Sequence, residues 1–272
     1  MLAKKEMIGY NFFQLTRKRL KHRFNEEKGS SDIIIFEREE EKMIGIIGAM
    51  DQEVDELKSM MTDTEITTKA GLDFCKGILE GKEVVIVKCG VGKVNAAICT
   101  EALIETYHPE CVINTGVAGG LDADINIGDI VLSTDALEHD MDVRALGYER
   151  GVIPDQEESV YVADEGLRNK AFEVCKKVNP DIQVFMGRVV SGDQFISGKE
   201  KKDDLVRTFA AACAEMEGAS IAHTAGQNKV PFLIVRSISD KADDSAHMDY
   251  PEFLKIAVKN SVRMMTELVR EL

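Results

Sequence analysis

The sequence lacks long apolar runs, and it lacks an excess of basic side chains. The stretch Pro231–Val235, among its longest apolar runs, has five residues, whereas a helix that crosses a membrane needs about 20. The formal net charge is −14, and a nucleic-acid groove needs a basic stripe that displaces counterions. We therefore expect neither a membrane nor a nucleic acid among the partners of this chain.

The sequence also lacks the cysteine pairs and glycine patterns of common metal and cofactor sites. No C-x-x-C pair occurs, and the cysteines lie far apart along the chain, so we expect no metal. Gly90-Val91-Gly92-Lys93 has neither the spacing of a phosphate-binding loop nor the third glycine of a dinucleotide fingerprint, so we expect no cofactor. Dispersed thiols are typical of small core residues in a reducing cytoplasm. They are Cys75, Cys89, Cys99, Cys111, Cys175 and Cys213.

What the sequence does contain is enough apolar residues for a large core. It has 272 residues, of which 44% are hydrophobic and 30% charged, a composition typical of a folded globular chain. Residues 1–42 carry ten basic and eight acidic side chains, against 24 and 40 in residues 43–272. We interpret 1–42 as an N-terminal extension, either mobile or an artefact of a start site that lies at Met43, and 43–272 as one domain. A basic amphipathic helix that lies on a membrane is the alternative for the extension.

From Met43 onward, strand patterns alternate with helix patterns. Continuous apolar runs predict buried strands, and the segments between them have helical periodicity. This alternation predicts a single α/β domain with a mixed or mostly parallel sheet that helices cover on both faces. The expected strands are Met43–Ala49, Val84–Cys89, Cys111–Thr115, Ile130–Ser133, Val184–Ser191, Ala212–Met216 and Pro231–Ser239. The expected helices are Gln52–Met61, Lys93 to about Tyr107, Glu165–Lys177, Gly218–Gln227 and a last one from Pro251, which suits a first helical turn.

Three carboxylates follow the ends of predicted strands. Glu53, Glu217 and Asp240 each come shortly after one, and ligands of α/β sheets bind outside the carboxyl ends of the strands. A single acidic residue in that position is more often a helix cap, and the spacing of Gly116–Gly120 by itself predicts a tight turn. The agreement among three strand ends favours a catalytic site over three unrelated caps.

Five short motifs occur in order between residues 43 and 272. They are Gly45–Met50 with Glu53, Asn114–Gly116 with Ala118–Gly120, Ser191–Asp193 with Phe195-Ile196, Glu215–Glu217, and Val235-Arg236 with Ile238–Asp240. Together they closely resemble the bacterial 5′-methylthioadenosine/S-adenosylhomocysteine nucleosidases of the nucleoside phosphorylase superfamily. The resemblance implies a homodimer and a purine nucleoside phosphorylase-like fold. This fold is a single-domain three-layer α/β sandwich with a mixed, partly barrel-like central sheet.

The resemblance also implies an activity and roles for individual residues. The activity is hydrolysis of the N-glycosidic bond of 5′-methylthioadenosine and S-adenosylhomocysteine, which releases adenine and the 5-thioribose product. Glu53 would activate the attacking water, Asp240 would protonate adenine N7, and Glu217 would hold the ribose hydroxyls. The further residues of the implied pocket are Met50, Val91, Val117, Phe195, Ile196, Met216, Arg236, Ser239 and Tyr250, with Val143, Leu146 and Pro154 contributed by a partner subunit.

The chemistry of the reaction gives a reason for these residue types. Breaking the bond makes the ribose oxocarbenium-like, and nearby carboxylates stabilise its positive charge. The adenine anion is a poor leaving group, so adenine leaves protonated. The acid that protonates it must keep its proton at a pH above the ordinary aspartate pKa of about 3.9. Two positions depart from the family pattern, because Val117 stands where serine is frequent and Tyr250 where phenylalanine is common. The relative substrate preference is therefore open.

Other functions on the same fold remain as alternatives. A nucleoside phosphorylase needs cations for its phosphate, but Met50–Glu53 offers two carboxylates and no arginine. Arg144 and Arg236 are the other candidates, and Arg236 can instead pair with a carboxylate. An aminodeoxyfutalosine hydrolase differs in pocket width, which depends on loops. A non-catalytic nucleoside-binding protein is expected to lack at least one of the three carboxylates, and all three are present.

Overall fold

The structure, a computed structural model, describes residues 42–243 and 246–272. Apart from Lys42, the extension expected over residues 1–42 lies outside the described residues. These residues include the whole segment predicted to form the nucleosidase domain, apart from residues 244 and 245.

Ten strands of the described segment pair into one continuous mixed sheet. Its central strands are Val- and Ile-rich and buried along their whole length, as expected for strands that are covered on both faces. The strands are β1 (Ile44–Gly48), β2 (Thr62–Lys69), β3 (Leu72–Leu79), β4 (Lys82–Lys88), β5 (Cys111–Gly120), β6 (Ile130–Glu138), β7 (Tyr161–Val162), β8 (Val184–Ser191), β9 (Ala211–Glu215) and β10 (Phe232–Asp240).

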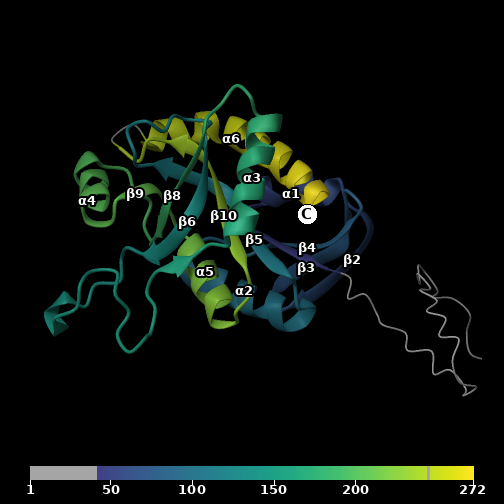
Figure 1. The fold of residues 1–272 in the computed structure, drawn as a ribbon, viewed down its shortest axis with the longest axis horizontal. Coiled ribbons are helices and arrows are strands. Elements are labelled where there is room, and N and C mark those ends of the chain that lie inside the picture. The colour runs from purple at the N-terminus through teal and green to yellow at the C-terminus, as the bar shows by residue number, and fades with distance from the viewer. Residues whose placement is uncertain (1–41, 244–245) are drawn as a thin grey trace, which may run out of the picture. The chain divides into compact units, whose positions relative to one another are not determined.

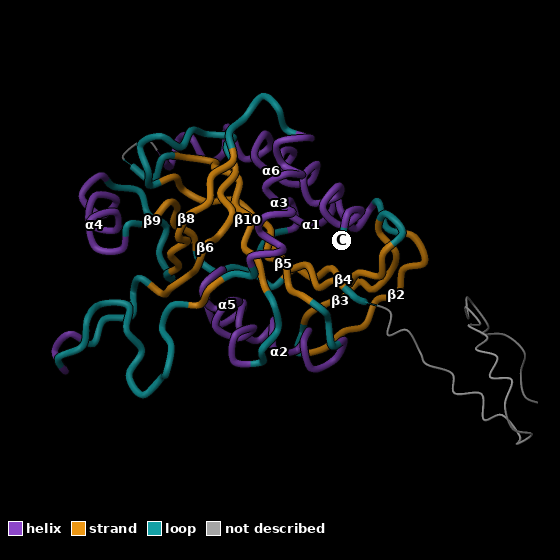
Figure 2. The backbone as a smooth tube through the Cα atoms, viewed as in Figure 1, coloured by secondary structure: helices purple, strands orange, loops and turns teal. Residues whose placement is uncertain are grey.

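Five of these strands close into a barrel, and four others extend from it as an open arm (Figure 2). The closed ring runs β5–β10–β6–β8–β9 and returns to β5. One edge of β5 is shared, because it pairs with β1 over residues 111–114 and with β9 at Gly119 and Gly120. From β1 the arm continues through β4, β3 and β2. The predicted mixed and partly barrel-like sheet is confirmed.

Helices cover the sheet on two sides (Figure 1). On one side α6 (Ala246–Glu271) packs against β10, α1 (Asp51–Ser59) and α3 (Glu165–Val178), and on the other α2 (Lys93–Tyr107) packs against α5 (Gly218–Gln227). Helix α4 (Lys199–Phe209) lies beside β9, and a single 3-10 turn, η1 (Arg144–Leu146), lies between β6 and β7. The predicted three-layer arrangement is confirmed.

The prediction that Gly116–Gly120 forms a turn is wrong, because β5 continues through Gly120. Strand β10 pairs with this segment, so its backbone takes part in the sheet. Glycine is needed here for a different reason. A Cβ atom at Gly116 would lie 2.5 Å from Nη1 of Arg236 and 2.8 Å from Oε1 of Glu53. The absence of a side chain lets both charged groups approach the strand.

The last helix begins earlier than its proline suggests. Helix α6 begins at Ala246, so Pro251 lies inside it and not in its first turn. A proline in this position removes one backbone hydrogen bond. The remaining turns compensate by packing, since Met264, Met265 and Leu268 are fully buried in the core. Burial of the apolar face therefore outweighs the local cost of the proline.

The cysteines are core residues, as predicted. All six are buried and none forms a disulfide, and burial raises the pKa of the Cys99 thiol to about 12. In the part of the chain that the structure describes, no helix has the length and apolar character needed to cross a membrane.

Candidate active site

Glu53 lies in the first turn of α1, and its carboxylate turns back toward the strands. Oε2 accepts hydrogen bonds from the N–H groups of Ala49 (2.7 Å) and Met50 (2.9 Å), and Oε1 accepts one from Val117 (3.1 Å). Burial raises the pKa of Glu53, while the charge of Arg236 and these N–H groups oppose the rise. A buried carboxylate with a raised pKa and a fixed position is suited to take up a proton.

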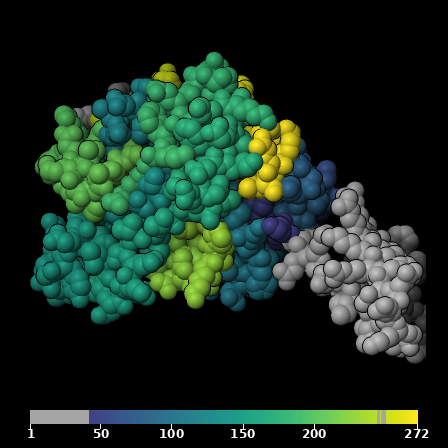
Figure 3. Space-filling view, in the orientation of Figure 1, coloured from purple at the N-terminus to yellow at the C-terminus, as the bar shows by residue number. Residues whose placement is uncertain are grey.

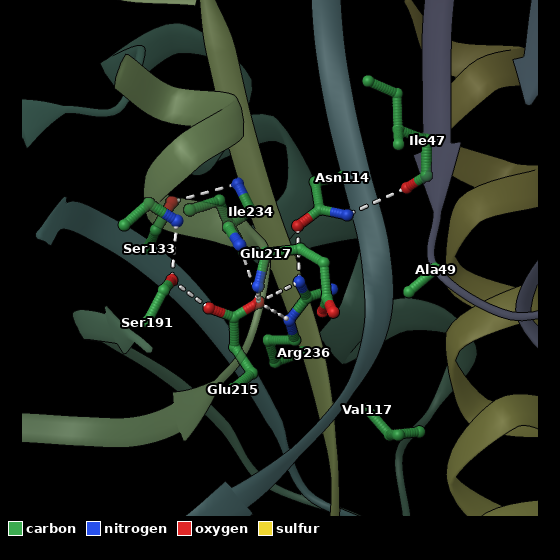
Figure 4. Close-up of polar contacts among 12 residues, drawn as sticks. Ile47, Ala49, Asn114, Val117, Ser133, Ser191, Glu215, Glu217, Ile234 and Arg236 are labelled. Carbon is green, nitrogen blue, oxygen red and sulfur yellow. Dashed lines mark hydrogen bonds and ion pairs between the residues drawn. The ribbon is translucent and has the colours of Figure 1, made fainter. Parts of the chain in front are cut away.

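A buried ion pair lies at the centre of the site (Figure 4). Arg236 on β10 is 2% exposed. Its Nε donates to Oε2 of Glu215 at 3.2 Å, and its Nη2 donates to the same oxygen and to Oδ1 of Asn114 at 2.5 Å. Glu215 also accepts hydrogen bonds from the Ser191 hydroxyl and the Gly218 N–H. Burial acts to raise the pKa of Glu215, but the charge of Arg236 and these donors hold it below its ordinary value.

Glu217 is the N-cap residue of α5, two residues beyond the ion pair. Its Oε1 accepts a hydrogen bond from the N–H of Gly92 at 2.8 Å, at the start of α2. Burial and the charge of Glu215 raise the pKa of Glu217 to about 7, although Arg236 and the Gly92 N–H act in the opposite direction. Near neutral pH this carboxyl group therefore exchanges readily between its protonated and ionised forms.

Asp240 ends β10 and is 2% exposed. Its Oδ2 accepts a hydrogen bond from the hydroxyl of Ser239 at 2.9 Å, and its Oδ1 accepts one from the N–H of Ala242 at 2.9 Å. The Ser239 hydroxyl also lies 3.4 Å from the carbonyl oxygen of Ala118 on the neighbouring strand. These contacts fix the orientation of the Asp240 carboxyl group at the end of the strand.

The hydroxyl of Tyr250 on α6 is influenced by all three carboxylates predicted from the sequence. Burial is the largest cause of the raised pKa of its hydroxyl, and the charges of Glu53, Asp240 and Glu217 raise it further. The three groups therefore lie within electrostatic reach of one hydroxyl, although they come from distant parts of the chain. The same hydroxyl donates to the thioether sulfur of Met50 at 3.3 Å.

Comparison with known proteins identifies the family of this chain. The family model described as the phosphorylase superfamily matches residues 43–270. Over 231 residues the chain is 43% identical to the 5′-methylthioadenosine/S-adenosylhomocysteine nucleosidase of Staphylococcus carnosus, in an alignment that spans 85% of this chain and 100% of that relative. The chain belongs to the 5′-methylthioadenosine/S-adenosylhomocysteine nucleosidase family.

Solved structures have the same fold as this member of the nucleosidase family. The nucleosidase of Neisseria meningitidis, solved in complex with methylthio-immucillin-A, has a TM-score of 0.81 and 38% identity, and the match covers 85% of this chain and 100% of that one. A structure of futalosine hydrolase from Helicobacter pylori has a TM-score of 0.80 and 34% identity, with 85% and 99% covered. The resemblance found in the motifs is confirmed.

Several residues that the nucleosidase resemblance assigned to the pocket lie beside the three carboxylates. The ring of Phe195 meets the ring of Tyr250 edge-on, with centroids 5.9 Å apart, and Phe195 is 50% exposed. Val91, which directly precedes the donor to Glu217, is also 50% exposed. Ile196 differs, because its side chain is buried in a small apolar cluster, which is compatible with the backbone contact that the resemblance implies. The other pocket residues beside the carboxylates are Met50 and Val117, whose N–H groups donate to Glu53, Ser239, which donates to Asp240, and Met216, which precedes Glu217.

Three predicted residues do not join this site. Val143, Leu146 and Pro154 lie in the segment between β6 and β7, which projects at one edge of the domain (Figure 1, Figure 3). Leu146 is 74% exposed. Their predicted position in the pocket of a second subunit is therefore compatible with their distance from the site of their own chain.

Two groups of the nucleosidase site receive no role from the sequence, namely Glu215 and the N–H of Gly92. A signal for Glu215 was present, because Arg236 lies within a buried strand and a buried guanidinium needs a counter-charge. No comparable signal exists for Gly92, since a backbone N–H has no residue type. Within residues 42–243 and 246–272, no group of three or more His, Cys, Asp or Glu side chains is arranged to hold a metal ion.

Proposed function

We propose that this chain hydrolyses the N-glycosidic bond of 5′-methylthioadenosine and S-adenosylhomocysteine, releasing adenine and the corresponding 5-thioribose. The observation that carries the proposal is that the charges of Glu53, Glu217 and Asp240 all act on the one Tyr250 hydroxyl, in a chain 43% identical to a nucleosidase of this name. N-glycoside cleavage needs a base for the water, an acid for the leaving base and a negative charge beside the sugar. Glu53, Asp240 and Glu217 are proposed for these three roles in that order.

Glu53 is proposed as the base that takes a proton from the attacking water. Its three backbone donors hold the carboxylate in one position, so water can be aligned without reorganisation of the side chain. Its burial raises its pKa, which makes the ionised form a stronger base than an ordinary glutamate.

Asp240 is proposed as the acid that protonates N7 of adenine. Ser239 and Ala242 each donate to one of its oxygens, so the group is oriented before substrate binds. Proton transfer to the base converts a poor anionic leaving group into neutral adenine. Phe195, exposed and close to Tyr250, is proposed to stack on the purine ring.

Glu217 is proposed to hold the ribose hydroxyls. Because it would accept hydrogen bonds from two hydroxyl groups, Glu217 would be ionised in the complex. Its negative charge would stabilise the oxocarbenium-like sugar. Met216 precedes it and would pack against the sugar. Met50, Val91 and Tyr250 would surround the alkylthio group.

The charges around Glu53 favour water over phosphate as the nucleophile. Arg236 is the cation beside Glu53, and its Nε and Nη2 groups already donate to Glu215 and Asn114. Arg144 pairs with Asp142 in the projecting segment. A phosphate that entered beside Glu53 would therefore meet a net negative environment.

An aminodeoxyfutalosine hydrolase is the second candidate, favoured by the likeness to the futalosine hydrolase structure of Helicobacter pylori. The bond cleaved and the acid–base chemistry would be the same. Only the group attached at the 5′ carbon would differ, and Met50 and Tyr250 would be its neighbours.

A homodimer in the cytoplasm is proposed as the working form. Leu146 in the projecting segment is 74% exposed, and Val94 and Ile98 on α2 are 69% and 48% exposed, which is typical of a surface that another subunit covers. Light scattering should give twice the monomer mass, and Leu146→Ser should raise the KM for 5′-methylthioadenosine. A monomer with full activity would overturn this proposal.

The function is tested by incubating the chain in phosphate-free buffer with each of five nucleosides and separating the bases released. The compounds are 5′-methylthioadenosine, S-adenosylhomocysteine, aminodeoxyfutalosine, adenosine and inosine. Adenine release from the first two at higher kcat/KM than from the others supports the proposal. Aminodeoxyfutalosine as the best substrate would favour the second candidate, and no release from any of them would overturn both.

A further inference from the structure

Helix α2 begins beside Glu217 without a side chain of its own that caps it. Its N-cap residue, Gly92, has a φ of +97°, which favours glycine. Free N–H groups at the start of a helix need partners and favour negative charge. Here two carboxylates from other segments of the chain accept hydrogen bonds from them. Glu217 accepts from Gly92, and Oδ1 of Asp193 accepts from the N–H of Lys93 at 2.8 Å.

The side chain of Lys93 completes a ring of hydrogen bonds at this helix start. Its Nζ donates to Oδ1 of Asp140 at 2.7 Å and to Oε2 of Glu138 at 2.9 Å. Oδ2 of Asp140 accepts from the N–H of Asp193 at 3.0 Å, and Asp193 in turn accepts from the Lys93 backbone. We call Lys93, Asp140 and Asp193 the lysine ring.

The lysine ring is shielded from solvent on its lysine side. The Lys93 side chain is 18% exposed, and those of Glu138 and Asp140 are 12% and 16% exposed. Ion pairs of this kind are less screened than surface pairs, and removal of one partner leaves partly buried charges without compensation. Glu138 would keep its contacts with the Ser220 hydroxyl and His223, so Asp140 is the group that would lose its cation, and the ring would open there.

Three functional segments meet at the lysine ring. The turn that ends at Gly92 supplies the donor to Glu217, on the proposed ribose side of the pocket. Asp193 lies two residues before Phe195, on the proposed purine side. Asp140 begins the projecting segment that carries Leu146.

We infer that Lys93 is a positioning residue that holds the ribose side and the purine side of the pocket at a fixed separation. The inference rests on the proposed function, because it concerns the same pocket. The ammonium group bonds to Glu138 and Asp140 and not to the proposed acid or base. Its loss therefore weakens the binding of nucleoside and adenine more than it slows bond cleavage.

The test compares Lys93→Met with Lys177→Met, a matched change in an exposed ion-paired lysine that joins α3 to α6. Kinetics with 5′-methylthioadenosine, calorimetric titration with adenine and a thermal melt are recorded for each. For Lys93→Met we expect the KM and the adenine Kd each to rise about tenfold while kcat stays within about threefold. For Lys177→Met we expect no change in the KM, the adenine Kd or the kcat.

A second variant, Asp193→Ala, breaks the lysine ring at an exposed residue whose loss leaves the core intact. We expect it to raise the KM and the adenine Kd in the same direction, by about threefold. A lowered melting temperature with unchanged KM and unchanged adenine Kd in both variants would show a merely structural role and overturn the inference. An unmodified chain that neither releases adenine nor binds it would overturn the proposed function as well.

Discussion

Glu215 and Glu217 lie two residues apart, and their pKa values are displaced in opposite directions. The pKa of Glu215 is held low by its ion pair with Arg236, whereas burial and the charge of Glu215 raise that of Glu217 to about 7. The guanidinium bonds directly to Glu215. One carboxylate thus stays ionised as part of the scaffold, and the other titrates near neutral pH, where a substrate hydroxyl can shift its equilibrium.

Glu217→Gln should stabilise the protein at high pH and reduce its activity. Between an unfolded pKa of about 4.3 and the folded value of about 7, the folded state holds a proton that the unfolded chain releases, so wild-type stability falls as pH rises. A glutamine cannot ionise and keeps an oxygen for the Gly92 N–H. We expect the variant to melt about 5 °C above wild type at pH 8 and level with it at pH 4, with kcat/KM lowered about 100-fold. A melting difference that does not change with pH would contradict the assignment.

Glu53→Gln should lower kcat about 1,000-fold with little change in KM, because the water loses its base. In the wild type, kcat/KM should fall as pH decreases and the carboxylate takes up a proton. Since burial raises the pKa of Glu53, this fall should occur above the ordinary glutamate value of about 4.3. The control is Glu56→Gln on the exposed face of the same helix, which should retain wild-type kcat and pH profile. Equal turnover in both variants would remove Glu53 from the mechanism.

Asp240→Asn should bind 5′-methylthioadenosine with nearly wild-type Kd and lose at least about 100-fold in kcat, because the amide cannot donate a proton to N7. Single-turnover kinetics and equilibrium binding separate the two effects. Asp55→Asn, on the exposed side of α1, is the matched control. Turnover near that of the wild type would exclude Asp240 as the acid.

Tyr250→Phe should change which 5′ substituent is preferred. The hydroxyl beside the sulfur of Met50 places a polar group where an alkylthio chain is proposed to lie, and it raises the cost of burying a methyl group there. Its removal should raise the ratio of kcat/KM for 5′-methylthioadenosine over S-adenosylhomocysteine about fivefold, which corresponds to one net hydrogen bond. An unchanged ratio would place the hydroxyl outside the pocket.

Buried elements were predictable from the sequence, and exposed ones were not. Strand β1 begins and ends within one residue of its predicted bounds, and all five of its residues are buried, because a strand covered on both faces leaves an uninterrupted apolar run. Strand β8 and helix α5 have the predicted bounds. All eight residues of β2 are exposed, so it leaves no apolar pattern. Helix α4 has mainly charged residues, and only Leu205 and Phe209 are buried.

The same limit applies to the candidate site. Three carboxylates were predictable because the ends of neighbouring strands meet at one edge of a sheet. The bond from Gly92 to Glu217 and the bond from Lys93 to Asp193 join residues that are 125 and 100 positions apart. Such contacts depend on how the barrel closes, and strand closure is not encoded in any short motif.

The sugar product shows most directly whether water replaces adenine at the ribose. The chain is incubated with 5′-methylthioadenosine in phosphate-free buffer and in phosphate buffer, and the sugar is identified by mass spectrometry. We expect free 5-methylthioribose at equal rates in both buffers. Product formation only with phosphate, as 5-methylthioribose 1-phosphate, would contradict this expectation.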